Sequence, residues 1–402
     1  MTRHIAQLVT IALVVAACGG GAVGGDAASE DTTGRDKTGG PVDKSVIVPD
    51  HLKTMQAAWD TDFGNTVIDL NELLVGIPAS DPRDAIPPID DPQFEPVGTS
   101  DWIDDREPGV LLEVDDEARF YPLSILTRHE IVNDEFGAVP LAVTYCPLCN
   151  TAVVFDRRFG DETLRLGVSG LLRNSDLVMW DDLTHTLWQQ ITGEAIVGEH
   201  AGEMLETVGS AIVRWLDFKT EHPQGQVLAQ EQGFGRVYGN NPYEFYSSRP
   251  APYGFFTGEI DGRYPALERV VGVTVNGVEK AYPFSVINKQ LVVNDTVGDD
   301  PVVIFWGAAD TADALDSGSI SDAIAIGTGI AYSPIIKDQT LTFEPHNDVE
   351  FKDVETGTTW SILGTATSGE LEGQTLELVP HRNEFWFAWQ AFFPDAEVWT
   401  ES

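Results

Sequence analysis

The sequence predicts an α+β, β-rich protein made of two homologous β-dominated halves (an internal duplication) with short helices. Short runs of β-branched and aromatic residues, bounded by turn residues, follow one another from residue 109 onward and indicate strands. Only short segments space their apolar residues as helices do. Several segments of the first half recur in the second half in the same order, which indicates the duplication.

Residues 1–17 are predicted to be a lipoprotein signal peptide. The apolar run after Arg3 and His4 is too short to span a bilayer, and small residues follow it directly before Cys18. This arrangement resembles a bacterial lipobox, which implies cleavage before Cys18 and lipidation of its thiol; an ordinary signal peptide with an incidental cysteine is the alternative. Residues 18–44 are expected to be a flexible tether. We therefore expect a protein anchored by lipid to the cell membrane and facing outside the cytoplasm.

The charge balance excludes one class of partner. The 402 residues include 24 Lys and Arg against 64 Asp and Glu, for a net charge of −40. Such a surface repels nucleic-acid phosphates and anionic lipid headgroups, so no nucleic-acid partner is expected. The acidic residues are scattered, and we interpret them as a source of solubility or of adaptation to salt. Which protein or small molecule the chain binds stays open.

Residues 45–104 are predicted to form a helical and extended strap. Residues 51–59 and 69–74 are expected to be short helices. Residues 77–98 are rich in Pro and Asp and are expected to be extended, because each proline prevents helical and ladder hydrogen bonding.

The first repeat is predicted to cover residues 105–225. Apolar residues at helical spacing predict a short helix over 122–134, and an amphipathic segment predicts a closing helix over 211–222. Strands are predicted at 110–114 and 118–121, on both sides of the cysteine turn, and at 163–169, 176–180 and 187–191.

The second repeat is predicted to cover residues 267–398, after an aromatic, Gly/Pro-rich connector over 226–266. Tyr-Pro-Leu-Ser-Ile at 121–125 recurs as Tyr-Pro-Phe-Ser-Val at 282–286. At the same offset, Ile-Val-Asn-Asp at 131–134 recurs as Val-Val-Asn-Asp. The shared residues are expected to be scaffold. The residues that occur in the first copy only, with their counterparts in the second, are His129 (Gln290), Glu130 (Leu291), Cys146 (Gly307) and Cys149 (Asp310).

Two of the three cysteines, Cys146 and Cys149, lie in one Cys-Pro-Leu-Cys turn. In thioredoxin-like folds such a motif opens a helix, whose N-terminus lowers the pKa of the first thiol. Here β-branched and aromatic residues follow at 152–156 and predict a strand. A Cys-x-x-Cys turn between two strands is similar to the knuckle of zinc ribbons and rubredoxins. Two thiolates then need one or two further ligands.

His129 is the best candidate for a further ligand, because it lies on the short helix that leads into the cysteine strand and is missing from the second copy. With Cys146 and Cys149 it would form a set that fits copper or zinc with one open position. Possible accessory residues are Glu130, His185, His200, Arg173 and Asn174. For the last two, which could bind an anion or orient a ligand, a strand-connecting turn is the simpler interpretation.

Three functions are compatible with these residues, and whether the protein is an enzyme stays open. The first is binding of copper or zinc by the cysteines and His129. The second is thiol-disulfide exchange by the same thiols, with His129 or Glu130 as the partner in proton transfer. The third is a cell-surface interaction module with a structural cysteine pair.

Four stretches together resemble a bacterial domain-of-unknown-function family, number 3179. They lie at 129–134, 143–149, 168–176 and 187–198, and the His-Glu and Cys-Pro-Leu-Cys motifs match the family pattern without departure. The resemblance covers roughly residues 80 to 395. It implies an exported or lipid-anchored bacterial protein and carries over no established activity.

Overall fold

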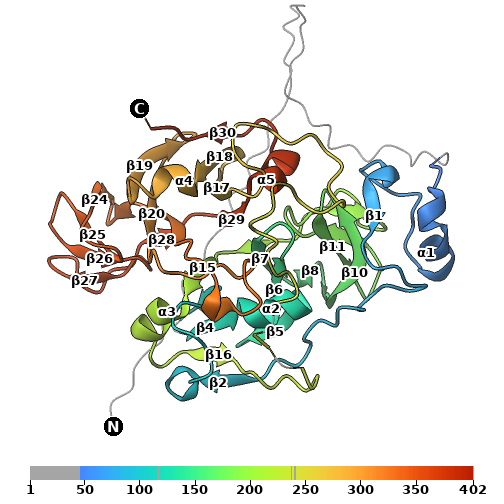
Figure 1. Ribbon diagram of the computed structural model, residues 1–402, viewed down its shortest axis with the longest axis horizontal. Helices are drawn as coiled ribbons and strands as arrows, with labels where there is room; N and C mark the ends of the chain where they lie inside the picture. Colours follow the sequence, from blue (N-terminus) through green and yellow to red (C-terminus); the bar gives the residue numbers. More distant parts are fainter. Residues whose placement is uncertain (1–45, 116, 237, 240, 402) are drawn as a thin grey trace, which may run out of the picture. The chain divides into compact units, whose positions relative to one another are not determined.

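The computed structural model describes residues 46–401 except 116, 237 and 240. The predicted signal peptide, the tether and Cys18 lie outside the described residues. The described part is β-rich, and its longest helices have seven residues (Figure 1). The predicted β-rich class with short helices is therefore confirmed. Within this part of the chain no helix has the length and apolar character of a membrane span.

The segment before the main sheets contains short helical turns and two strands. The helix predicted over 51–59 is present as a 3-10 turn and a short helix, whereas residues 69–74 form a single 3-10 turn and a strand. Leu73–Val75 pairs antiparallel with residues 171–173, which requires extended backbone. The elements are η1 (Asp50–Leu52), α1 (Lys53–Ala58), η2 (Leu70–Glu72), β1 (Leu73–Val75), β2 (Phe94–Pro96) and η3 (Val97–Thr99).

A segment that we call the strap, residues 77–93, connects β1 to β2. It has no helix, and its only β-pairing is the isolated bridge of Ile89. This agrees with the extended conformation that its prolines predict.

The first set of sheets follows the strap. Its elements are β3 (Pro108–Val114), β4 (Glu117–Pro122), α2 (Leu123–His129), β5 (Ile131–Phe136), β6 (Val139–Cys146), β7 (Thr151–Asp156), β8 (Arg158–Phe159), β9 (Glu162–Thr163), β10 (Leu166–Arg173), β11 (Asp176–Asp181), β12 (Leu187–Gln189), β13 (Ala195–Val197), β14 (Thr207–Val208), β15 (Ala211–Arg214), α3 (Trp215–Glu221) and β16 (Gln226–Leu228). The strand orders are β15-β3-β4-β16-β2, β14-β7-β6-β5 and β1-β10-β11-β12-β13, with β8-β9 as a separate hairpin.

The second set of sheets begins after the connector. Its elements are β17 (Arg269–Val275), β18 (Val278–Pro283), α4 (Phe284–Ile287), β19 (Val292–Val297), β20 (Asp300–Gly307), η4 (Ile320–Asp322), β21 (Thr328–Ser333), β22 (Ile335–Ile336), β23 (Gln339–Thr340), β24 (Phe343–Pro345), β25 (Glu350–Asp353), β26 (Thr359–Ser361), β27 (Ala366–Ser368), β28 (Glu377–Leu378), β29 (His381–Phe385), α5 (Trp386–Phe392) and β30 (Glu397–Val398). The strand orders are β29-β17-β18-β30, β19-β20-β21-β28 and β24-β25-β26-β27, with β22-β23 as a separate hairpin.

The second set follows the strand order of the first. In each set a central hairpin (β3–β4 or β17–β18) lies between a later antiparallel strand (β15 or β29) and a final parallel strand (β16 or β30). A second sheet joins three successive strands to a late fourth strand, and a third sheet is a meander of four strands. The first set has two additional edge strands, β1 and β2.

Two predicted helices are shorter than expected. The helix predicted over 122–134 ends at His129, because Glu130 takes a left-handed backbone conformation (φ 59°) and the next residues pair with β6. The helix predicted over 211–222 begins only at Trp215, because Ala211–Arg214 pairs with β3. In both places strand pairing overrides the local helical pattern.

The two sets meet at the cysteine turn. Strand β29 of the second set packs beside β7 of the first (Figure 1). The N–H of Phe385 donates to the carbonyl of Cys149 at 2.9 Å. The largest cluster of buried apolar side chains includes Val143 and Val154 from the first set and Phe385 and Phe387 from the second. The turn is therefore enclosed by both sets.

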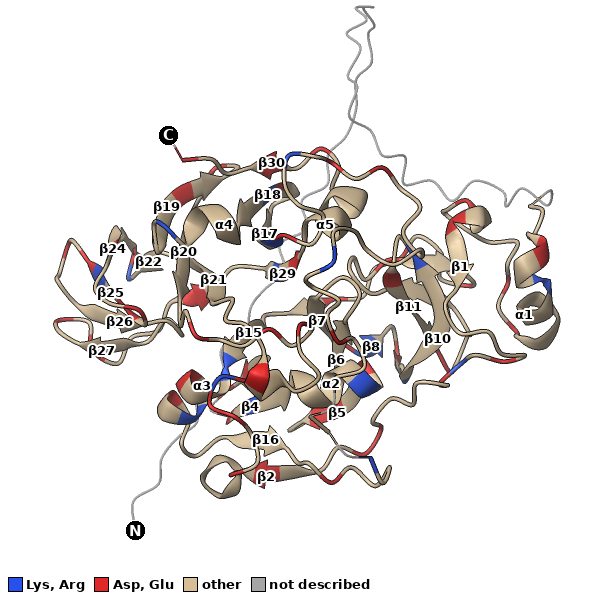
Figure 2. Ribbon diagram, in the orientation of Figure 1, with Lys and Arg blue, Asp and Glu red and all other residues tan. Residues whose placement is uncertain are grey.

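The acidic residues are spread over the described elements and outnumber the basic ones (Figure 2). This distribution agrees with the expectation of scattered acids.

Candidate metal centre

The cysteines lie at the tip of the β6–β7 hairpin. Cys146 is the last residue of β6 and pairs with Thr151, so residues 147–150 form the turn between two strands, as predicted. The N–H of Cys149 donates to the carbonyl of Cys146 at 3.2 Å. Asn150 completes the turn with a φ of 55°, a left-handed conformation that asparagine tolerates better than most residues.

The tip of the β10–β11 hairpin meets this turn. Asn174 and Ser175 both have positive φ (50° and 67°), as a two-residue type I′ turn requires, and Arg173 pairs with Asp176 across them. The Cys146 thiol donates to the carbonyl of Ser175 with a sulfur–oxygen distance of 3.7 Å. Two tight turns from different sheets therefore bring Asp176 to the cysteines.

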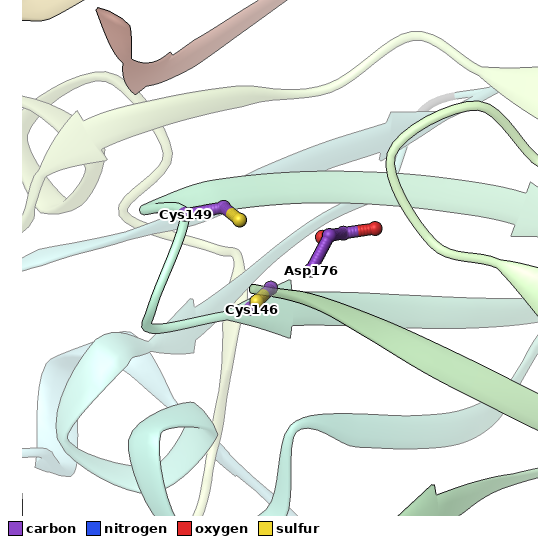
Figure 3. A group of neighbouring side chains, drawn as sticks. All are labelled: Cys146, Cys149 and Asp176. Carbon is purple, nitrogen blue, oxygen red and sulfur yellow. The ribbon is translucent and has the colours of Figure 1, made fainter. Parts of the chain in front are cut away.

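The Sγ atoms of Cys146 and Cys149 and a carboxylate oxygen of Asp176 lie within 4.8 Å of one another (Figure 3). All three residues are buried, with exposed fractions of 2%, 0% and 0%. In a tetrahedral zinc site the ligands lie about 2.0–2.3 Å from the ion, so two ligand atoms are separated by about 3.3–3.8 Å. Binding of an ion would therefore draw these three side chains closer together. Among the described residues, no other group of His, Cys, Asp or Glu meets the 4.8 Å limit.

The two carboxylate oxygens of Asp176 differ in their contacts. Oδ2 accepts hydrogen bonds from the Gln189 side-chain amide at 2.6 Å and from the N–H of Ile191 at 3.0 Å. Oδ1 is buried and accepts no hydrogen bond of ordinary geometry, although the Cys146 thiol and the N–H of Leu177 lie near enough to the carboxylate to oppose the rise of its pKa. An orphaned buried oxygen is costly unless a cation or another donor reaches it, and the bonds to Oδ2 orient the carboxylate as outer contacts orient metal ligands. This arrangement fits a bound metal ion.

Burial makes the site unfavourable for negative charge when no cation is present. It raises the pKa of Asp176 to about 6, against the hydrogen bond from Gln189, and raises the pKa of both thiols. The neighbouring Asp176 carboxylate adds to the shift at each thiol. A metal ion supplies the missing positive charge and favours the deprotonated ligands. Buried thiols of raised pKa differ from the low-pKa, accessible thiols that redox enzymes use.

Glu384 brings a further carboxylate to this site from β29 of the second set. It is completely buried, and burial raises its pKa to about 7. Oε1 lies 3.4 Å from Nε of Arg382, while Oε2 accepts no hydrogen bond of ordinary geometry, although the Thr151 hydroxyl lies near enough to the carboxylate to oppose the rise of its pKa. The charge of Glu384 contributes to the raised pKa of Cys149, so the two groups interact.

His129, the third ligand predicted from the sequence, is not part of the cysteine group. Nδ1 lies 2.6 Å from the carbonyl oxygen of Pro87, which can only accept, so Nδ1 carries the proton. Nε2 lies 2.7 Å from the Tyr238 hydroxyl and accepts from it. Burial lowers the pKa of His129 to about 4, which keeps the ring neutral. Both ring nitrogens are thus engaged, one with Pro87 of the strap and the other with Tyr238 of the connector. The third candidate ligand beside the two cysteines is Asp176.

The predicted accessory histidines also lie apart from the group. His185 accepts from the N–H of Asp60 at 3.2 Å and contacts the Trp180 ring edge-on. His200 lies 3.2 Å from a carboxylate oxygen of Glu203. Both are placed by local packing.

The remaining accessory residues border the site. Glu130 is buried behind Cys146, and its Oε1 accepts from the Tyr243 hydroxyl at 3.2 Å. Arg173 pairs with Glu72 at 2.7 Å, and Asn174 forms the β10–β11 turn as the simpler interpretation proposed.

Asp176 and Glu384 were missed because their positions depend on contacts between distant segments. The sequence did contain one signal for Asp176, since it directly follows Asn-Ser, a pair suited to a tight hairpin, within a stretch already regarded as polar. No comparable local signal marks Glu384.

A family model described as Protein of unknown function (DUF3179) matches residues 83–396. The resemblance inferred from the four sequence stretches is thereby confirmed. No curated protein and no solved structure matches the chain. The matched range includes all three residues of the cysteine group and Glu384.

Proposed function

The chain belongs to the family described as Protein of unknown function (DUF3179), whose description states no activity, and we propose from the site itself that this protein binds one transition-metal ion through Cys146, Cys149 and Asp176. The observation that carries the proposal is the buried cluster of two sulfurs and one carboxylate within 4.8 Å. The buried Oδ1 of Asp176, which accepts no hydrogen bond of ordinary geometry, supports it independently.

Of the two metals considered, zinc is favoured by this donor set. Zinc accepts both thiolate and carboxylate ligands, whereas Cu(I) prefers soft sulfur ligands alone. Three protein ligands leave one position of a tetrahedral zinc ion open, which is the arrangement of catalytic zinc sites. A zinc ion held there would act as a Lewis acid toward a molecule in the open position. Glu384, whose charge acts on Cys149, would lie near this ion.

We further propose that the protein is a lipoprotein, anchored through Cys18 and facing outside the cytoplasm. The support is the N-terminal sequence: an apolar run, small residues, a cysteine and a Gly-rich tether. In such a compartment two neighbouring thiols oxidise readily. A bound metal ion would keep Cys146 and Cys149 reduced.

We also propose that the two sets of sheets arose by internal duplication. The common strand order supports this, and so do matching polar contacts. The Tyr121 hydroxyl donates to Asp134 at 2.5 Å, and the Tyr282 hydroxyl donates to Asp295 at 2.9 Å. These four residues stand at the same offset in the sequence.

The metal proposal is tested by elemental analysis of the protein purified under reducing conditions, combined with a count of titratable thiols. We expect close to one zinc ion per chain, with Cys146 and Cys149 unreactive until a chelator removes it. A metal-free protein whose two thiols cycle with a disulfide would overturn the proposal and favour thiol-disulfide exchange.

A metal-free protein whose thiols never react would favour a structural cysteine pair, the third function. The Asp348→Asn variant is a suitable control, because this aspartate lies exposed in the second set and should leave the metal content unchanged.

A further inference from the structure

A pocket of about 220 Å³ lies beside the cysteine group. Leu148, which lies between the two cysteines in the chain, and Leu177, which follows Asp176, both line it. The remaining wall is formed by the start of the strap, by β10 and by the connector around Tyr243. We call it the Glu130 pocket, because Glu130 is the one charged residue among the described residues that line it.

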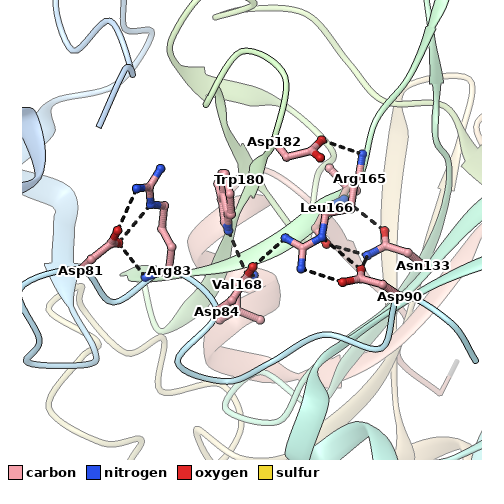
Figure 4. Close-up of polar contacts among 10 residues, drawn as sticks. All are labelled: Asp81, Arg83, Asp84, Asp90, Asn133, Arg165, Leu166, Val168, Trp180 and Asp182. Carbon is pink, nitrogen blue, oxygen red and sulfur yellow. Dashed lines mark hydrogen bonds and ion pairs between the residues drawn. The ribbon is translucent and has the colours of Figure 1, made fainter. Parts of the chain in front are cut away.

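The strap side of the pocket is fixed by Asp84. Its carboxylate accepts from the N–H of Val168 at 3.0 Å and from the Trp180 indole at 3.1 Å, and it pairs with Arg165 at 2.6 Å (Figure 4). Arg165 also pairs with Asp90, further along the strap, at 2.9 Å (Figure 4). These contacts tie the strap to β10 and β11. The pocket is therefore preformed, as most small-molecule sites are.

The chemistry of the lining selects for a cation with an apolar body. Apart from Glu130 and the tyrosine hydroxyls, the side chains of the described residues that line the pocket are apolar, and none of these residues is Lys, Arg or His. Tyr243 and Phe255 add aromatic rings, which attract cations through their faces. The net charge of −40 further raises the local concentration of cations.

Glu130 itself lacks a positively charged partner in the pocket. The hydrogen bond to its side chain comes from the neutral hydroxyl of Tyr243. Burial raises the pKa of Glu130 to about 7, although this hydrogen bond opposes the shift. An ammonium group placed against the carboxylate would supply the counter-charge that the protein does not.

We propose that the Glu130 pocket binds a small apolar amine, with its ammonium group on the Glu130 carboxylate and its hydrocarbon part among Leu148, Leu172 and Leu177. The proposal goes beyond metal binding and does not depend on it.

The test uses the full-length protein in detergent after a chelator has removed any metal, so that the amine cannot bind to an ion. Isothermal titration calorimetry compares 2-phenylethylamine with the neutral 2-phenylethanol, which has nearly the same shape. We expect saturable binding of the amine that is at least about tenfold tighter than that of the alcohol, as a charge-assisted contact provides.

The Glu130→Gln variant should lose at least about tenfold in amine affinity and keep the affinity for the alcohol. Glu107→Gln is the matched control, because Glu107 is also buried, also has a pKa raised to about 7, and does not line the pocket. Leu172→Phe, at a partly exposed position, should exclude both molecules by filling the space.

Equal affinity for the amine and the alcohol, or no binding of the amine by the folded wild-type protein, would overturn the proposal. These outcomes need no variant, so they decide the question even if Glu130→Gln does not fold. Metal content is measured separately, so a failed metal proposal leaves this test intact.

Discussion

The cysteine turn of the first set and its counterpart in the second set share a backbone frame, but they carry different side chains. Glu130 and Leu291 both have a left-handed backbone, with φ of 59° and 62°. Each carbonyl then accepts from the next strand at 2.8 Å, from Tyr145 in the first set and from Trp306 in the second. Strand β6 ends at Cys146 and β20 ends at Gly307. The backbone frame is thus common to both sets.

The difference lies in what fills the space between the two hairpin tips. In the first set the side chains of Cys146 and Asp176 meet there. In the second set the N–H of Ala308 donates to the carbonyl of Asp348 at 2.8 Å, and a methyl group added at Gly307 would collide with that carbonyl. In the second set a backbone–backbone hydrogen bond therefore lies where the side chains of Cys146 and Asp176 meet in the first set. The backbone frame is therefore a property of the fold, whereas the proposed metal site depends on a few side chains.

The largest expected effect is a loss of zinc affinity, and it concerns the hairpin tip of the first set. Replacing one ligand, as in Cys146→Ser, Cys149→Ser or Asp176→Asn, should weaken zinc binding by at least about 100-fold, since loss of a mere supporting contact already costs 10–100-fold. Competition with a chromophoric chelator measures this affinity.

Two controls accompany these variants. Asp348→Asn in the second set and His129→Gln beside the site should change zinc affinity by less than about threefold. If His129→Gln folds normally and loses zinc, the result would favour His129 as the third ligand and contradict Asp176.

The next effect concerns a motif that both sets retain. Asp181 accepts from the Trp188 indole at 2.9 Å and from Thr184, and Asp353 accepts from the Trp360 indole at 2.9 Å and from Thr356. Asp→Ala at either site leaves several buried donors without an acceptor and should cost about 3 kcal/mol of unfolding free energy.

Urea unfolding of the metal-free protein measures both variants. Values that agree within about 1 kcal/mol would support a common scaffold role. A variant that unfolds normally but loses zinc would show that this motif belongs to the site.

A smaller effect tests the packing at Gly307. Gly307→Ala places a methyl group against the Asp348 carbonyl and should destabilise the protein by about 1–3 kcal/mol, as overpacking does. Cys146→Ala, the matching change in the metal-free first set, removes one buried sulfur and should cost about 1 kcal/mol. Thermal unfolding distinguishes the two variants. A Gly307→Ala variant with unchanged stability would contradict the close contact between Gly307 and the Asp348 carbonyl.

The last effect is a pH dependence of the metal-free protein, to which each buried glutamate contributes a part. Burial raises the pKa of Glu107, Glu130 and Glu384 from 4.5 to about 7. Between pH 4.5 and about pH 7 the folded state therefore binds more protons than the unfolded state. The unfolding free energy falls as the pH rises through this range. Each group contributes at most about 1.4 kcal/mol per pH unit.

Urea unfolding at pH 6.5 and pH 8 measures this dependence. Below pH 6.5 the buried His129 and His381, whose pKa is lowered to about 4, act in the opposite direction. Glu130→Gln should reduce the slope, and Leu291, its counterpart in the second set, contributes none. A stability that increases over this range would contradict the assignment.

The fold class and the place of the site could be predicted from the sequence because both depend on local signals. Alternating apolar residues mark strands, and the β-branched run after Cys149 places the turn between strands. The helix bounds were wrong where a strand partner overrides local periodicity, as at Ala211–Arg214. The sequence pointed to His129 as the third ligand because it is near Cys146 in the chain, whereas Asp176 reaches the cysteines only through contact between two hairpin tips.

X-ray absorption at the zinc edge of the wild-type protein distinguishes the proposed ligands from a histidine ligand. We expect two sulfur neighbours at about 2.3 Å and oxygen neighbours at about 2.0 Å, without the outer scattering of an imidazole ring. Asp176→Asn should alter the oxygen shell and leave the sulfur shell recognisable. An imidazole signal, or protein without zinc and with Cys146 and Cys149 joined as a disulfide, would contradict the proposed metal site.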